Sequence, residues 1–492
     1  MKKDRFALSI CLVAAIAVVL TTAVPAQAEE NSAEEALKAL QRRVSKLESV
    51  EKELKDVKAR LEKLESMGLP PADEEAIGKR VEEWFDQNRE TIIEQMTGPE
   101  AKRALLGFDM EMAGYLTFIY QTVLTSNVID KNGDGERDNA RRDALSFSFG
   151  LEMTARLAEN QYAFMLIEGG NGDSIDAFIP NNMGLNDDAN PTADPLDPTN
   201  SGSASDMRVT EAYYEGSFFT DKFVITFGKL DLTNYFDSNA VANDEMWQFI
   251  SSSLVNNAAI AFPDDNDAAI RMLYSPFGGV DLDDEDENAT DFLLLQLGLS
   301  ETDTNFNEVT QDGLVIGEVW FRPHKHPSLK RFVNGRPGNY RLGGWLSEAD
   351  TLSLREMRRG DEEGESTLSG VYLSFDQEVY DNITLFMRYG VQDNSLALNE
   401  AFWSFGFQLD GSMWGRENDR LGFGTAINVK NARAHFARPE FQKNEHLYEL
   451  YYMFHVTDFL HISPVFQVLD NPGGESRSST AAVAGLRLQF DF

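Results

Sequence analysis

The chain has 492 residues, of which 42% are hydrophobic and 11% aromatic, so it carries enough apolar side chain to form a folded core. Acidic residues outnumber basic residues 81 to 44, and the net charge of −37 argues against a nucleic-acid partner, because phosphates require a basic surface. The single cysteine, Cys11, excludes a disulfide framework and a cysteine-ligated metal site.

Residues 1–28 have the features of a secretory signal peptide. Basic residues precede an apolar run over 6–24, and Ala26-Gln27-Ala28 is an A-x-A cleavage site. The alternative is an uncleaved membrane anchor, since the run is long enough to span a bilayer. We expect cleavage after residue 28, and therefore export from the cytoplasm.

The region 29–68 is predicted to form an α-helical coiled coil. Leucines recur every seven positions, valines follow three residues after several of them, and Lys and Glu fill most other positions. This pattern favours three or four strands, so we expect a homotrimer; a single solvated helix is the alternative. Residues 69–107, which begin next to Gly68 and Pro70-Pro71, are expected to be a linker with an amphipathic helix.

From residue 108 onward the apolar period changes from about 3.6 to 2. Apolar and polar residues alternate in segments of about ten residues with aromatic residues near the ends, which is typical of a transmembrane β-barrel. Sixteen such segments begin near residues 108, 144, 161, 208, 222, 268, 292, 314, 338, 368, 382, 402, 420, 446, 459 and 482. We therefore predict an all-β transmembrane barrel of about 16 antiparallel strands over 108–492.

The connections between these segments mostly alternate between long and short, as extracellular loops and periplasmic turns do. An even strand count places both ends of the barrel, and with them the predicted coiled coil, in the periplasm. The connections 275–291 and 322–337 are long for periplasmic turns, so a count that differs by two strands stays open.

Two groups of motifs in the barrel region are the most specific. The first is Gly228-Lys229-Leu230-Asp231, Phe236-Asp237-Ser238-Asn239, Ala242-Asn243-Asp244 and Gln248-Phe249. The second is Glu449-Leu450-Tyr451-Tyr452, Pro464-Val465-Phe466-Gln467, Asn471-Pro472-Gly473-Gly474, Gly485-Leu486-Arg487 and the terminal Phe492. Together they resemble the carbohydrate-selective porin B (OprB-type) family of bacterial outer membranes. The resemblance covers 108–492 and implies a sugar-admitting channel whose C-terminal aromatic residue, Phe492, is read by the barrel-assembly machinery. The coiled coil is a departure from the simplest members.

The long connection 229–267 is the best candidate to narrow such a channel. Sugar hydroxyls need paired donors and acceptors, and the sugar ring needs an aromatic face. The candidate constriction and solute-binding residues are Lys229, Asp231, Asp237, Asn239 and Trp247 on this connection, with Glu211, Arg271 and Arg388 on strands. We expect Trp247 to stack on a sugar and Asp237 to accept its hydroxyl. The alternatives are a polar loop that lies over the mouth, and lumen charges that bind nothing.

Residues 130–138 resemble the first part of a calcium loop. Oxygen ligands occupy alternate positions with glycine at the turn. The candidate ligands are Asp130, Asn132, Asp134, Glu136 and Asp138. The twelfth position is Arg141 where a calcium loop has Glu, and an Asp/Asn/Gly turn at a hairpin tip is the alternative. No other cofactor is expected.

The sequence thus predicts a passive porin of the bacterial outer membrane for carbohydrates and small hydrophilic solutes, with its N-terminal region in the periplasm. Its partners would be membrane lipids and those solutes. One alternative is a general or ion-selective porin that serves mainly as an envelope tether through its coiled coil. The other is a barrel enzyme, but the chain has no HExxH, GxSxG or phosphate-binding glycine loop, and no serine motif accompanies His435 or His446. We therefore expect that the protein is not an enzyme.

Overall fold

The computed structural model describes residues 109–125, 143–179, 181–186, 207–263, 266–282, 291–302, 313–349, 366–393, 395, 397–434, 443–475 and 480–492. The predicted signal peptide, coiled coil and linker lie outside the described residues, and so does the candidate calcium loop. The chain divides into two compact units, residues 1–111 with 155–157, and residues 112–154 with 158–492. The second unit contains the barrel and is the one discussed below.

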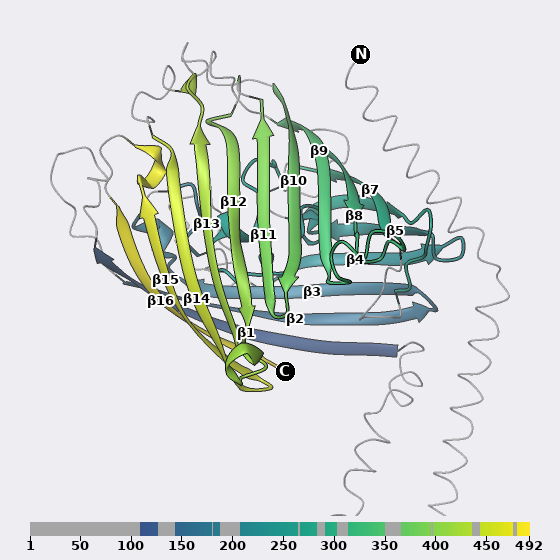
Figure 1. The fold of residues 1–492 in the computed structure, drawn as a ribbon, viewed down its shortest axis with the longest axis horizontal. Coiled ribbons are helices and arrows are strands. Elements are labelled where there is room, and N and C mark those ends of the chain that lie inside the picture. Colours follow the sequence, from purple (N-terminus) through teal and green to yellow (C-terminus); the bar gives the residue numbers. More distant parts are fainter. Residues whose placement is uncertain are drawn as a thin grey trace, which may run out of the picture. The chain divides into compact units, whose positions relative to one another are not determined.

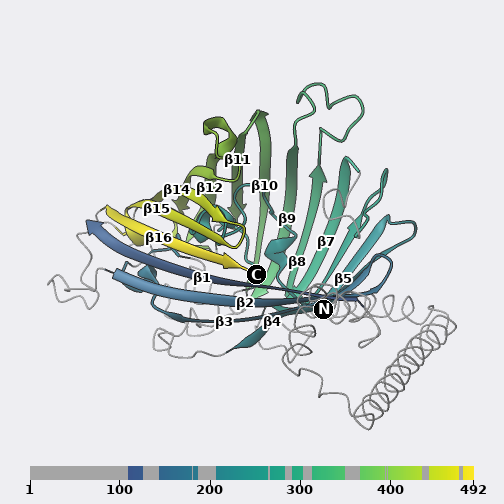
Figure 2. The same ribbon diagram turned by 90° about the horizontal axis from the view of Figure 1, so that it is seen from below.

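Sixteen strands follow one another along the chain and close into a single barrel, in which the first strand pairs with the last (Figures 1 and 2). They are β1 (Asp109–Thr125), β2 (Asp143–Ala158), β3 (Gln161–Gly172), β4 (Arg208–Phe218), β5 (Phe223–Leu230), β6 (Asp267–Tyr274), β7 (Leu293–Glu301), β8 (Gly313–Phe321), β9 (Gly338–Ala349), β10 (Ser366–Tyr380), β11 (Ile383–Gln392), β12 (Asn399–Asp410), β13 (Arg420–Lys430), β14 (Glu445–Thr457), β15 (Leu460–Asp470) and β16 (Ala481–Asp491). Each begins within three residues of its predicted start, so the predicted antiparallel barrel and its strand count are confirmed.

Short helices occur only in the connections of the described chain. They are η1 (Ile175–Ala177), η2 (Leu232–Asn234), α5 (Ser252–Val255), η3 (Gly411–Trp414) and η5 (Pro472–Gly474). Among the described residues, no helix combines the length and the hydropathy that a membrane crossing requires.

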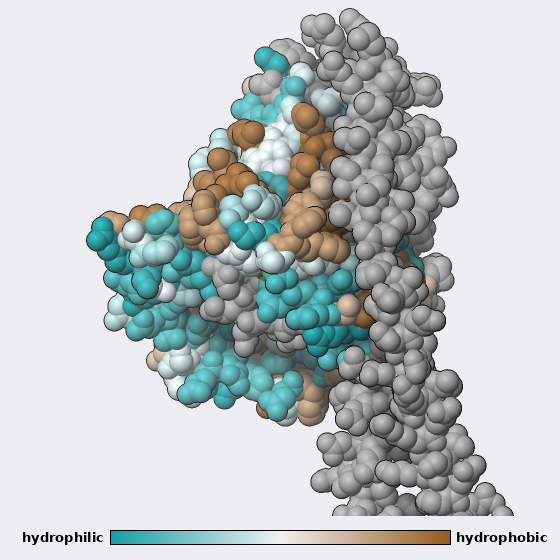
Figure 3. All heavy atoms as spheres, turned by 90° about the vertical axis from the view of Figure 1, so that its right-hand side faces the viewer, coloured by the Kyte–Doolittle hydropathy of each residue, from teal (hydrophilic) through white to brown (hydrophobic). Residues whose placement is uncertain are grey.

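The alternation along each strand separates an outer apolar face from an interior polar one. In β14, Leu447 and Glu449 are buried, while Tyr448 and Leu450 between and beyond them are more than 40% exposed. Apolar residues also gather over the upper part of the face drawn in Figure 3. Large exposed apolar side chains on the outer wall are expected where lipid, and not water, is the solvent.

Two long connections turn into the barrel: residues 173–186 after β3, and residues 231–263 after β5. Many of their apolar side chains are buried against the inner faces of strands from β11 round to β2. The main contributors from the connections are Ile175, Ile179, Met183, Leu185, Phe249, Ile250 and Leu254. The largest hydrophobic cluster therefore lies inside the barrel, between these two connections and one part of the wall.

The β6–β7 turn, one of the two unusually long ones, is organised by a single carboxylate. Asp291 Oδ2 accepts hydrogen bonds from Ser275 Oγ (3.0 Å) and from the backbone N–H groups of Phe277 (2.6 Å) and Gly278 (2.9 Å). Its Oδ1 accepts one from the Leu293 N–H (3.1 Å). Burial alone would raise the pKa of Asp291, but these donors outweigh it and lower the pKa below its usual value.

Replacing Asp291 with alanine should destabilise the barrel by about 1–3 kcal/mol, because several buried donors lose their acceptor. A lowered folded pKa means that the stabilisation is fully present above the unfolded pKa of about 4 and is lost as pH falls through the folded value. Urea unfolding in lipid vesicles, at neutral and acidic pH, measures both effects. Asp381, an exposed carboxylate in the β10–β11 turn, provides the control, and equal losses in Asp291→Ala and Asp381→Ala would contradict the assignment.

Candidate channel constriction

The connection 231–263 is held in the barrel interior by a buried ion pair. Asp237 Oδ2 lies 2.6 Å from Nε of Arg388 on β11, and the two residues are 2% and 0% exposed. The same guanidinium donates to the backbone carbonyls of Asp237 (3.1 Å) and Leu254 (2.8 Å) and to Asn243 Oδ1 (3.2 Å). Because desolvated charges are tolerated only when they are fully bonded, this arrangement ties three points of the connection to one strand.

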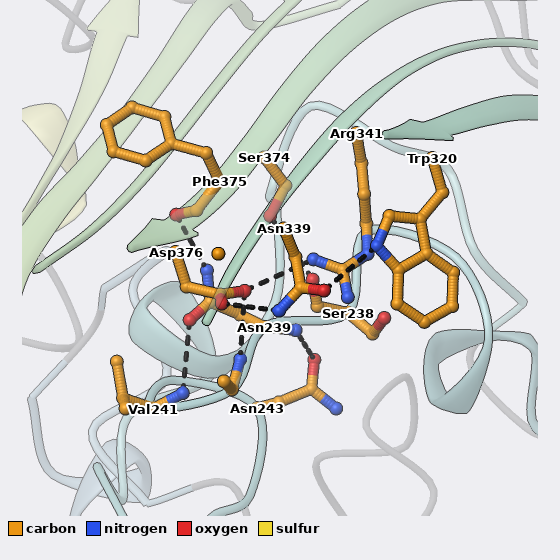
Figure 4. Close-up of polar contacts among 12 residues, drawn as sticks. Ser238, Asn239, Val241, Asn243, Trp320, Asn339, Arg341, Ser374, Phe375 and Asp376 are labelled. Atoms are coloured by element: carbon orange, nitrogen blue, oxygen red, sulfur yellow. Dashed lines mark hydrogen bonds and ion pairs between the residues drawn. The ribbon is translucent and has the colours of Figure 1, made fainter. Parts of the chain in front are cut away.

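Strands β8 and β10 hold the same part of the connection. Glu318 on β8 accepts the Asp237 N–H (2.9 Å) and the Tyr372 hydroxyl (2.8 Å). On β10, the Phe375 carbonyl accepts from Asn239 Nδ2 (3.1 Å), and Asp376 accepts the Ala240 N–H (3.2 Å). Figure 4 shows the centre of this network, in which Asn339 and Arg341 of β9 also donate to Asp376.

The later part of the connection is bonded to β14 and β16. Glu449 on β14 accepts the Ile250 N–H (2.8 Å), and Arg487 on β16 donates to the carbonyls of Glu245 (2.5 Å) and Gln248 (3.0 Å). The connection therefore crosses the interior from β5 and is bonded to several separate strands of the wall.

A cavity of about 770 Å³ remains between this connection and the inner faces of β1–β5. Its lining combines carboxylates, amides, hydroxyls and aromatic rings. The residues are Tyr115, Glu152, Phe164, Leu166, Glu168, Arg208, Thr210, Glu211, Tyr213, Glu215, Lys229, Asp231, Thr233, Asn234, Tyr235, Asn243, Glu245, Met246, Asn256, Asn257, Ala258, Ile260, Phe262, Pro263 and Asn266. We call this space the eyelet.

More carboxylates than bases line the eyelet, and the arginines that lie near it bond to the connection, to Asp376 or, in the case of Arg271, to the eyelet carboxylate Glu215. Six carboxylate residues line it, against Arg208 and Lys229 as the only bases among its lining residues. Arg388 and Arg487 hold the connection, and Arg341 pairs with Asp376. A low-dielectric passage with an excess of one charge concentrates the opposite charge.

The aromatic lining has a defined arrangement. Tyr213 on β4 packs against Phe164 on β3, with ring centroids 4.9 Å apart. Tyr235, on the connection, carries the Arg271 guanidinium over its ring at 4.3 Å from the centroid, and Arg271 is also paired with Glu215 (3.3 Å). One face of Tyr235 is thus occupied by a cation.

The eight constriction residues chosen from the sequence fall into three groups. Lys229, Asp231 and Glu211 line the eyelet. Asp237, Asn239, Arg388 and Arg271 are buried and bonded as described above, so they position the connection and the Tyr235 ring, and none of them is among the lining residues of the eyelet. Trp247 packs on the His461 ring (centroids 4.4 Å apart) and lines a second cavity of about 610 Å³ that also contains Arg420 and His455.

Apart from Glu211, sequence reasoning missed the residues that β3 and β4 contribute to the eyelet. Glu211, Tyr213 and Glu215 alternate on one face of β4, so strand periodicity would have placed Tyr213 and Glu215 in the lumen together with Glu211. It also missed that 173–186 turns inward, although the apolar residues in this otherwise polar connection were a usable signal.

Among the described residues, no group of three or more His, Cys, Asp or Glu side chains is placed to hold a metal ion. The candidate calcium ligands lie in the undescribed segment 126–142, so calcium binding stays a prediction from the sequence.

A closed barrel of 16 strands with a long connection pinned across its lumen defines a porin-type channel. The family model described as "Carbohydrate-selective porin, OprB family" matches residues 138–492, and the chain belongs to this family. It is therefore a protein of the bacterial outer membrane, and a channel rather than an enzyme.

Two relatives bear on this assignment. Porin B of Pseudomonas aeruginosa is 26% identical over 188 residues, which cover 32% of this chain and 41% of that protein, so the match spans less than half of the curated relative. The structure of Pseudomonas putida OprB at high pH aligns with a TM-score of 0.63 and 18% identity over 81% of this chain and 97% of that one. At this identity the structural likeness establishes a common fold.

Proposed function

We propose that the protein forms a water-filled channel for the passive, moderately selective diffusion of carbohydrates and other small hydrophilic solutes, and that these solutes pass through the eyelet. The observation that carries the proposal is the pinned connection 231–263, which restricts the lumen to a passage lined by carboxylates, amides and tyrosines. Membership of the carbohydrate-selective family supports the same conclusion.

The chemistry of the eyelet suits a sugar. Five asparagines line the eyelet, and amide groups have the mixed donor and acceptor character of sugar hydroxyls, although several of these amides also bond to the protein. They are Asn234, Asn243, Asn256, Asn257 and Asn266. The Tyr213 and Phe164 rings add an aromatic surface for the apolar face of a pyranose. A purely ionic filter would need neither feature.

Replacing Tyr213 with alanine should weaken the block of ion current by added glucose. A stacked aromatic ring contributes on the order of 1 kcal/mol, which corresponds to a roughly fivefold weaker block. Single-channel recordings in planar bilayers, with glucose added to either side, measure this.

Trp247→Ala is the matched comparison, because it removes an aromatic ring from the second cavity. We expect it to change the glucose block much less than Tyr213→Ala does. The opposite order would place the sugar contact at Trp247, in the second cavity, and would contradict solute passage through the eyelet.

We also propose that the protein is a homotrimer with its N-terminal coiled coil in the periplasm. The heptad pattern of 29–68 supports this, and light scattering on the full chain in detergent tests it.

A further inference from the structure

The start of β4 contains a β-bulge that opens onto the eyelet. In the β3–β4 ladder, Leu166 pairs with Glu211, and the next residue, Ile167, pairs with Val209, so Thr210 is an extra residue without a partner across the ladder. A bulge changes the direction of neighbouring side chains. As a result, Thr210 and Glu211, which are consecutive, both line the eyelet.

The Thr210 side chain is left with an unused hydrogen-bonding group. The residue is 6% exposed, and its hydroxyl has no hydrogen-bond partner in the described part of the chain. A buried hydroxyl is normally bonded, so an unbonded one on a residue that lines a cavity indicates a position for a polar group of a ligand.

Carboxylates flank Thr210 in the β3–β4 ladder, because Glu211 follows it and Glu168 pairs with Arg208, two residues before it. Glu211 accepts the Asp231 N–H (3.3 Å) and Asn234 Nδ2 (3.4 Å), which orients its carboxylate, and the Thr233 N–H (2.8 Å) orients that of Asp231. Glu168, on β3, accepts a hydrogen bond from the Tyr115 hydroxyl. The two bases of the lining are Arg208, which pairs with Glu168 in the β3–β4 ladder, and Lys229, which donates to the Val209 carbonyl (3.0 Å).

We propose that the eyelet recognises amino sugars, that is, hexoses with a protonated amine, in preference to neutral sugars, and that it disfavours sugar acids and sugar phosphates. The ammonium group supplies three donors for the carboxylates of Glu211, Asp231 and Glu168, while the hydroxyls of the ring bond to Thr210 and the asparagines. This inference rests on the proposed function, since it names the solute class that the same passage favours.

Electrostatic attraction in a narrow passage acts on the solute before any contact forms. We therefore expect glucosamine to enter proteoliposomes at least about threefold faster than its neutral counterpart N-acetylglucosamine, and glucuronate to enter more slowly than glucose. The preference should shrink when the ionic strength rises from about 0.05 M to about 0.5 M, because salt screens charges in a hydrated channel.

The test measures the glucosamine to N-acetylglucosamine rate ratio by proteoliposome uptake for the wild type, for Glu168→Gln/Glu211→Gln, and for Asp410→Asn/Glu417→Gln. The last variant removes two carboxylates from the second cavity and so matches the change in net charge. We expect the ratio to fall toward one in the eyelet variant and to stay at the wild-type value in the control.

A wild-type ratio of one, or an equal fall in both double variants, would overturn the proposal while leaving a sugar channel in place. Failure of every sugar to enter would instead refute the proposed function. If the eyelet variant does not assemble, the salt dependence of the wild-type ratio still decides: a ratio independent of ionic strength overturns the proposal.

Discussion

Replacing Arg388 with methionine should release the connection 231–263 from its position across the lumen, raise the single-channel conductance several-fold and remove discrimination among sugars. The substitution removes the guanidinium that bonds Asp237, Leu254 and Asn243, and it leaves the Asp237 carboxylate buried without its partner. Breaking a buried ion pair in this way costs about 3–5 kcal/mol. Movement of the connection into the aqueous lumen relieves that cost, whereas the strand ladder of β11 does not depend on the Arg388 side chain.

Planar-bilayer conductance and glucose block measure the effect. The variant Arg416→Met is the control, because it removes a guanidinium from the exposed β12–β13 turn and should leave conductance at the wild-type value. Asp237→Leu/Arg388→Met removes both charges and should recover part of the wild-type behaviour, since apolar side chains can replace a buried pair. A wild-type conductance for Arg388→Met would show that the other contacts suffice to hold the connection.

Loss of Phe492 should sharply reduce the amount of assembled barrel. Phe492 closes the seam between β1 and β16: its N–H donates to the Gly114 carbonyl (2.9 Å), and its carbonyl accepts the Gly114 N–H (2.8 Å). Its ring packs on Gly114, and a Cβ atom added to Gly114 would lie 2.6 Å from Cε2 of the Phe492 ring. The residue as a whole is nevertheless 78% exposed, so it is available to a second protein during assembly.

Two variants separate these roles. Deletion of Phe492 removes both backbone bonds, each worth about 0.5–1.5 kcal/mol, together with the ring, whereas Phe492→Ala removes the ring alone. We expect Phe492→Ala to fold from denaturant into detergent like the wild type, yet to reach the outer membrane of cells poorly, and Phe492→Tyr to restore it. Wild-type membrane levels of Phe492→Ala would contradict recognition of the terminal ring by the assembly machinery.

Strand positions were predictable because the environment acts on each residue locally. A barrel wall has lipid on one side and the interior on the other, so the side chains of every strand must alternate between the two. In β14, for example, buried Glu449 lies between exposed Tyr448 and Leu450, and this pattern can be recognised without knowing which strands pair with β14. The β8–β9 turn, 322–337, stayed ambiguous as a possible strand pair. Its structure is a series of short-range bonds, such as the Lys330 N–H to the His326 carbonyl (3.0 Å), which have no period to detect.

The composition of the eyelet was only partly predictable. Glu211, Lys229 and Asp231 were found from strand alternation and from the position of the long connection. The Thr210 bulge was not, because it is a mismatch between the registers of two strands. Nor could the charge of the eyelet be deduced from the net charge of −37, since it depends on which arginines are engaged elsewhere.

The amino-acid sequence alone predicts the barrel and its strand order, since both follow from local periodicity and segment length. It indicates 229–267 as the best candidate to narrow the lumen, with a loop over the mouth as the alternative. Tertiary structure decides the roles of the individual side chains. Asp237 and Arg388 are 151 residues apart in the sequence. Considered separately, each is a charged residue that could bind a solute, and only the fold shows that they bond to each other. Their ion pair satisfies both buried charges and holds the connection, so the carboxylates of the opposite wall are the ones that line the eyelet.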